Sequence, residues 1–179
     1  MSTQAPAQAR MSPGAAALTV ASVLVVAVSL TWTYLSMRAV MNVGGSCADG
    51  GPYVSNQPCP DGSILIAVAV PALIIFSMIG TVSASGVGAP NLLVPMWGGL
   101  FGSLGWNFLE YAFKGPSVVW SWLICGVMFW GMALPAFVFM LSQLRATRRG
   151  PAVMWLPVYG LLGAVGLLFG WWTFVAIAG

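Results

Sequence analysis

The chain of 179 residues contains no histidine and very little charge, since Asp, Glu, Lys and Arg together make up 5% of it. Without histidine the protein lacks the most common metal ligand and the usual general base near neutral pH. Soluble domains carry roughly 25% charged residues, because a water-facing surface needs them. A chain with so little charge cannot cover a soluble globule, so we predict that its solvent is mainly lipid.

The sequence also lacks the patterns of the well-known catalytic chemistries. It contains no phosphate-binding P-loop, no paired carboxylates within an apolar segment, no Ser/His/Asp set and no cluster of metal ligands. The net charge of +3 comes from few groups, and no basic run with interleaved aromatics indicates a nucleic-acid partner. We therefore predict a protein that is not an enzyme and needs no cofactor or metal.

Hydrophobic residues make up 59% of the chain and gather in five long segments. About 20 apolar residues in a helix cross the ~30 Å hydrocarbon core of a bilayer. The segments after the first lie at about residues 63–83, 92–113, 118–144 and 153–178. We predict an all-α, polytopic transmembrane bundle of about five spans. Its parts are a cytoplasmic tail (1–13), a first transmembrane helix (14–43), an extracellular cysteine loop (44–62) and a four-helix transmembrane region (63–179).

The cysteine loop is the one long polar interval between apolar segments. Cys47 and Cys59 lie in it, among several glycines and prolines. A disulfide that closes a loop of this size stabilises a fold by roughly 3 kcal/mol in the chain-entropy model. We predict a structural disulfide, and the alternative is thiol–disulfide exchange, which generally uses a closer pair such as Cys-x-x-Cys. Cys125 lies inside an apolar segment, where a lone thiol packs as a small apolar group.

The positive-inside rule orients the bundle. Arg145, Arg148 and Arg149 follow the fourth apolar segment and form the densest positive cluster of the chain. This cluster predicts that the loop and the amino terminus are cytoplasmic, whereas the cysteine loop and the carboxyl terminus lie outside the plasma membrane. The cysteines agree, because disulfides persist in oxidising compartments. Arg38 and Lys114 fall on the outer side and count against this orientation.

Glu110 is the one acid within or beside an apolar segment. An ionisable group in such a place is a functional hypothesis by default, because burying it in hydrocarbon is costly. Lys114 follows on the same helical face, Asn107 precedes by one turn, and Arg38 lies at the outer end of the first segment. We predict a polar site of these four residues. It is a structural ion pair with Lys114 or Arg38, a contact for a ligand or ion, or a place of proton chemistry.

Glycines recur at helical spacing in two of the segments. Small residues let helix backbones approach closely, and in lipid this packing drives helix association. The predicted packing residues in the third segment are Gly98, Gly102 and Gly105, and those in the fifth are Gly160, Gly163, Gly166 and Gly170.

The loop from Gly44 to Tyr53, with Pro58-Cys59-Pro60, resembles small uncharacterised integral membrane proteins of actinobacteria. The resemblance covers the loop and the adjoining helix ends, and it implies a bacterial membrane compartment and a topology but no activity. We expect a non-enzymatic accessory or scaffold subunit, or a binder of an apolar ligand, whose partners are the lipid bilayer and other membrane proteins or a second copy. The alternatives are a small transporter that works as an oligomer and a membrane thiol–disulfide oxidoreductase.

Overall fold

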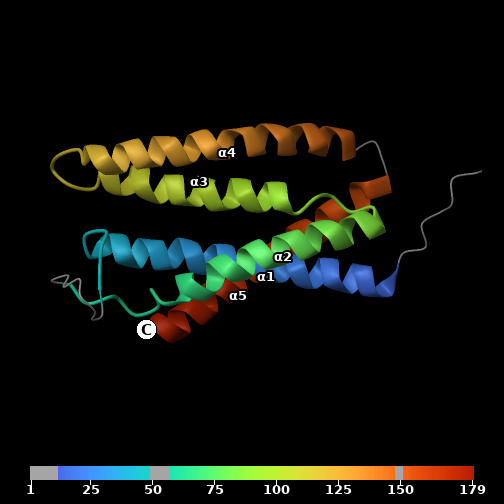
Figure 1. Cartoon of the computed structure of the whole chain (residues 1–179), viewed down its shortest axis with the longest axis horizontal. Helices are drawn as coiled ribbons and strands as arrows, with labels where there is room; N and C mark the ends of the chain where they lie inside the picture. The colour runs from blue at the N-terminus through green and yellow to red at the C-terminus, as the bar shows by residue number, and fades with distance from the viewer. Residues whose placement is uncertain (1–11, 49–56, 148–150) are drawn as a thin grey trace, which may run out of the picture.

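The computed structural model describes residues 12–48, 57–147 and 151–179. The described residues form five α-helices, one short 3-10 helix and no strands (Figure 1). The elements are α1 (Pro13–Asn42), α2 (Leu65–Val87), α3 (Leu93–Ala112), α4 (Trp120–Thr147), the 3-10 helix η1 (Pro151–Met154) and α5 (Trp155–Ala178). The predicted all-α bundle is thereby confirmed, while most of the predicted tail lies outside the described residues.

Four helices are long and apolar enough to cross a membrane, namely α1, α2, α4 over Trp120–Gln143, and α5. Helix α3 lies outside this group, and it carries the polar residues Asn107 and Glu110. It nevertheless lies beside α4 and runs between the same two ends of the bundle (Figure 1). The fold is that of a helical membrane bundle, and a fifth crossing by α3 stays a prediction.

Helix α2 extends beyond the predicted end of its apolar segment at Ser83. It continues to Val87 and ends at Gly88, whose φ of 67° lies in the left-handed region that favours glycine. The serines near its end are helical, and their hydroxyls donate to carbonyls one turn back in the helix. Ser83 Oγ donates to Gly80 O at 3.2 Å, and Ser85 Oγ donates to Val82 O at 2.7 Å.

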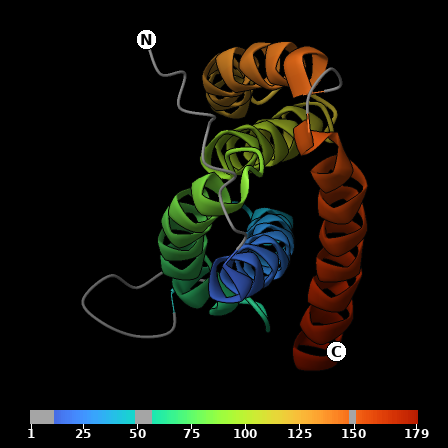
Figure 2. The same cartoon turned by 90° about the vertical axis from the view of Figure 1, so that its right-hand side faces the viewer.

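Helix α1 is the centre of the bundle. Helices α2 and α5 pack along it, and α3 contacts it from a third side, with α4 on the outer side of α3 (Figure 2). Among the described helices, only α1 and η1 have Cα atoms within 8 Å of those of α5. The architecture is therefore an α3–α4 hairpin and an α1–α2–α5 group that meet at α1.

The face of α1 toward its neighbours is rich in small hydroxyl residues. It buries Thr19, Ser22, Ser29, Thr33 and Ser36. Thr19 Oγ1 donates to Ser83 Oγ of α2 at 3.0 Å, so one of these hydroxyls joins the two helices directly. A cluster of larger side chains completes the core, with Val23 and Val26 against Leu73, Leu92 and Met96. Small residues allow the close helix approach on which packing in lipid depends.

The helices alternate between two ends of the bundle (Figure 1). We call the end with the cysteine loop, the α3–α4 connection and the carboxyl terminus of the chain the loop end. We call the end with the start of α1, the α2–α3 turn and Arg145 at the close of α4 the arginine end. The disulfide and the charged residues Arg38 and Glu110 lie at the loop end, opposite Arg145.

Candidate functional site

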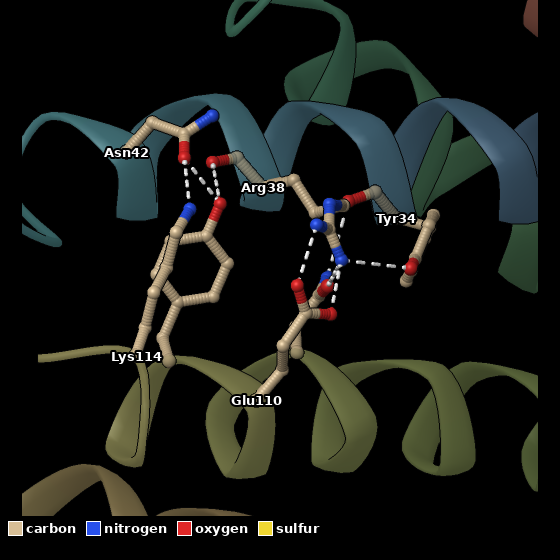
Figure 3. Close-up of polar contacts among 7 residues, drawn as sticks. Tyr34, Arg38, Asn42, Glu110 and Lys114 are labelled. Atoms are coloured by element: carbon tan, nitrogen blue, oxygen red, sulfur yellow. Dashed lines mark hydrogen bonds and ion pairs between the residues drawn. The ribbon is translucent and has the colours of Figure 1, made fainter.

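An ion pair between α1 and α3 lies at the loop end (Figure 3). The guanidinium of Arg38 donates from Nη1 to Glu110 Oε2 at 2.5 Å and from Nη2 to Oε1 at 2.8 Å. Such a two-pronged contact fixes the geometry as well as the charge balance. The two side chains are 28% and 35% exposed, so water screens the pair only in part.

Further contacts from α1 and α3 hold the guanidinium of Arg38 in place. Its Nη1 also donates to the hydroxyl of Tyr34 at 3.1 Å and to Asn107 Oδ1 at 3.5 Å. Asn107 is fully buried, and its Nδ2 donates to the backbone oxygen of Tyr34 at 3.2 Å. The Arg38 Cζ lies 5.7 Å and 5.6 Å from the ring centres of Tyr34 and Tyr111, within cation–π range. Arg38 is therefore held from both helices.

Lys114 takes a different partner from the one its spacing favours. Helix α3 ends at Ala112, so Lys114 has left the helix and no longer shares a face with Glu110. Its Nζ donates to Asn42 Oδ1 at 3.3 Å and lies 4.3 Å from the ring centre of Tyr111. The Tyr111 hydroxyl donates to the same Asn42 oxygen (Figure 3). Of the two cations predicted as partners of Glu110, Arg38 makes the contact.

The structure thus brings together the four residues predicted as a polar site. It adds Tyr34, Asn42 and Tyr111, which sequence reasoning missed, although Tyr34 and Asn42 stand one turn before and after Arg38 in α1. Both oxygens of Glu110 accept from Arg38, which favours structural pairing over proton chemistry. The cluster joins α1 to α3 and carries one more positive than negative charge.

The predicted disulfide joins Cys47 and Cys59, whose Cα atoms lie 4.8 Å apart, and Cys125 is a free, half-buried thiol. The residues that flank the disulfide contact two different helices. A Cβ on Gly45 would lie 3.1 Å from Trp122 Cζ2 of α4, and one on Gly62 would lie 3.0 Å from Phe174 of α5. In the described part of the chain no Cα of α4 lies within 8 Å of a Cα of α5, and the base of the loop lies close to both helices at this end.

Five of the predicted packing glycines lie at close helix contacts. Gly98, Gly102 and Gly105 face α4, and the closest approach is at Gly105, where a Cβ would lie 3.2 Å from Gly126 O. Gly166 and Gly170 face α1, where a Cβ would lie 3.0 Å from Leu24 O and 3.1 Å from Val28 O respectively.

Gly160 and Gly163 face no neighbouring helix within the single chain, so a packing role for them stays a prediction. A Cβ on either would meet no atom within 4 Å. Helix α5 crosses α1 obliquely (Figure 1), which confines the close approach to the turns around Gly166 and Gly170. The glycines nearer the start of α5 therefore have room beside them.

A pocket of about 500 Å³ lies at the arginine end, between the start of α3, the last turns of α4 and the start of α5. Its apolar lining is Pro90, Val94, Pro95, Phe139, Met140, Leu156 and Gly160, and its polar lining is Asn91, Gln143 and Tyr159. The hydroxyl of Tyr159 donates to Pro90 O at 2.9 Å and joins α5 to the α2–α3 turn. Sequence reasoning missed this pocket because its residues come from three distant segments.

The apolar helices and their close packing through small residues define the class of the protein as a small helical integral membrane protein. No protein-family model, curated protein or solved structure matches the chain. In the part of the chain that the structure describes, no group of Cys, Asp and Glu is placed to hold a metal ion.

Proposed function

We propose that the protein binds an apolar ligand from the membrane in the pocket at the arginine end. The observation that carries this proposal is the pocket itself. Its volume of about 500 Å³ falls within the range of ligand sites, which is roughly 300–1,000 Å³. Its lining is mostly apolar with a few polar side chains, which is the usual composition of a site that binds and orients a small molecule.

The lining supports binding rather than chemistry. Tyr159 is the one ionisable side chain among the lining residues, and its hydroxyl already donates to Pro90 O. A catalytic site generally brings together several titratable or nucleophilic groups within hydrogen-bond reach. We infer a binding function, and the polar cluster at the loop end supports the fold that shapes the pocket.

Filling the pocket is expected to abolish binding. A Cβ on Gly160 would meet no atom within 4 Å and the residue lines the pocket, so the indole of Gly160→Trp is expected to occupy part of the pocket. The probe is palmitate with a photoreactive diazirine in its chain, added to protein in lipid nanodiscs. We expect labelling of the pocket to fall by about tenfold or more, which corresponds to ~1.4 kcal/mol of binding free energy.

The matched control for this experiment is Gly163→Trp. Gly163 lies in the same helix and has equal room beside it, but it does not line the pocket. This variant is expected to label like the unmodified protein, with peptide mapping by mass spectrometry to locate the label. Equal labelling in both tryptophan variants and the unmodified protein would rule out this pocket as the binding site.

We further propose that the arginine end is cytoplasmic and that the protein resides in the plasma membrane. Arg145 lies exposed at the close of α4, and Arg148 and Arg149 follow it in the sequence, as the positive-inside rule requires of a cytoplasmic end. The disulfide lies at the opposite end, where an oxidising compartment would preserve it.

Single cysteines in a Cys125→Ala background test this orientation. Ser117 in the α3–α4 connection and Ser85 near the end of α2 are both exposed and lie at opposite ends of the bundle. In intact cells, a membrane-impermeant maleimide is expected to label Ser117→Cys and to spare Ser85→Cys until the cells are opened. The reverse pattern would show the inverted topology.

A further inference from the structure

We infer that the ligand of the pocket is an amphiphile with one hydrocarbon chain and an oxygen-containing head that accepts hydrogen bonds, taken up from the bilayer between α4 and α5. This inference rests on the proposed function and names the chemical class of its ligand. The arrangement of polar and apolar lining residues, the hydrogen bonds of Asn91, and the size and position of the pocket carry it.

The polar lining residues lie toward the ends of their helices. Asn91 precedes the start of α3 by two residues, Gln143 lies four residues before the end of α4, and Tyr159 lies four residues after the start of α5. The apolar lining includes Pro95 and Phe139, each four residues further into its helix than Asn91 and Gln143. Four residues of helix advance about 6 Å. On the α3 and α4 sides the pocket therefore has polar residues at a mouth near the end of the bundle and apolar residues about one turn deeper, whereas on the α5 side Tyr159 lies deeper than Leu156.

The hydrogen bonds of Asn91 leave a donor group at this mouth. Its Oδ1 accepts from the backbone nitrogen of Leu93 at 2.7 Å and from Thr81 Oγ1 at 3.2 Å. The oxygen thereby satisfies one of the free N–H groups at the start of α3, so the amide NH₂ is the part of Asn91 left for a ligand. The hydroxyl of Tyr159 already donates its hydrogen bond to Pro90 O. An exposed NH₂ donor favours a carboxylate, ester or phosphate oxygen over an apolar end group.

The size and position of the pocket fit a single chain from the bilayer. A volume of about 500 Å³ holds roughly 15–20 groups at ~30 Å³ each, the share of one water-sized group in a liquid. This is room for one hydrocarbon chain rather than two. The lining belongs to both α4 and α5, whose Cα atoms stay more than 8 Å apart in the described structure, so we place the entry from the bilayer between these two helices.

The test uses palmitate with a diazirine in its chain, with protein in nanodiscs, and competes it with unlabelled palmitate, a dipalmitoyl phospholipid or hexadecane. We expect palmitate or the phospholipid to displace the label at a concentration at least about tenfold below that of hexadecane. If palmitate displaces the label at a lower concentration than the phospholipid does, the natural ligand is a free fatty acid. If the phospholipid displaces it at the lower concentration, the ligand is one chain of a bilayer lipid.

Asn91→Asp is the variant that isolates the head contact. It keeps an oxygen to accept from Leu93, so the start of α3 stays capped, but it replaces the NH₂ donor with a negative oxygen. We expect palmitate to bind about tenfold more weakly to this variant, with binding of a diazirine-bearing alkane unchanged. Ser85→Asp, an exposed position outside the pocket, controls for added charge and should leave both probes unaffected.

The outcomes separate the ligand class from the proposed function. If hexadecane competes as well as palmitate and Asn91→Asp binds both probes normally, the pocket takes plain hydrocarbon and the inference about the head is wrong. If the unmodified protein labels no more than Gly160→Trp, the proposed function itself fails. A thermal unfolding midpoint of Asn91→Asp within the error of the unmodified protein verifies that the variant is folded.

Discussion

Replacing Arg38 with methionine is expected to destabilise the bundle by about 2–3 kcal/mol. The change leaves the Glu110 carboxylate at the α1–α3 contact without the cation that binds both its oxygens. Breaking a fully buried pair in this way costs ~3–5 kcal/mol. The Glu110 side chain is 35% exposed, and partial screening by water lowers the expected loss. The measurement is reversible unfolding in mild detergent, followed by circular dichroism.

Glu110→Gln is expected to cost less, about 1 kcal/mol. The guanidinium of Arg38 keeps the Tyr34 hydroxyl, the Asn107 oxygen and two aromatic rings as partners. The variant therefore leaves no unpaired charged group at the α1–α3 contact. The double variant Arg38→Met/Glu110→Gln should therefore be more stable than Arg38→Met, and their difference measures the penalty of the unpaired carboxylate. Lys114→Gln should change stability by less than about 0.5 kcal/mol. Strictly additive single changes would contradict this account.

Removing the disulfide is expected to cost about 3 kcal/mol and to loosen α4 relative to α5 at the loop end. The first effect arises because the linkage between Cys47 and Cys59 restricts the unfolded chain. The second arises because the chain passes close to both helices, where a Cβ on Gly45 would lie 3.1 Å from Trp122 of α4 and one on Gly62 would lie 3.0 Å from Phe174 of α5. The double variant Cys47→Ser/Cys59→Ser should therefore lower the unfolding midpoint and broaden the distance distribution between the two helices.

Paired spin labels measure that distance in a Cys125→Ala background. Ser121 in α4 and Ala176 in α5 are exposed near the loop end, and Leu141 and Val158 are exposed near the arginine end. After both disulfide cysteines are replaced by serine, the distribution for the first pair should broaden and that for the second should change little. An unchanged distribution for Ser121 and Ala176 would show that the loop does not hold these helices together.

The helices were predictable from the sequence because the physical requirement is simple. A segment that crosses hydrocarbon must satisfy its backbone internally and must be apolar over about 20 residues. The apolar segments consequently match the helices closely, except that α2 continues from Ser83 to Val87. There the serine hydroxyls donate to carbonyls within the helix. The sequence does not show this in advance, because the same Ser- and Gly-rich composition is typical of turns.

The contacts within the candidate sites were less predictable. The sequence places Lys114 four residues after Glu110 and predicts Arg38 on the same side of the membrane, but the choice between these cations depends on where α3 ends and on how it lies against α1. Arg38 and Glu110 are 72 positions apart, so no local spacing relates them. The pocket depends similarly on three helix ends that meet only in the folded chain, and no single segment carries its pattern.

The central place of α1 has a consequence for the order in which the protein forms during synthesis. Helices α1 and α2, and then α3 and α4, are neighbours both in the chain and in space, so each pair can associate soon after it leaves the ribosome. Helix α5 is made after all four and returns to α1, where Trp32 Nε1 donates to Thr173 Oγ1 at 2.9 Å. A contact of this kind, between segments 141 positions apart, belongs to the slow, non-local part of folding. Until α5 is in place, the face of α1 against which Gly166 and Gly170 pack is exposed to lipid. A nascent chain at that stage also lacks the part of the pocket lining that α5 provides.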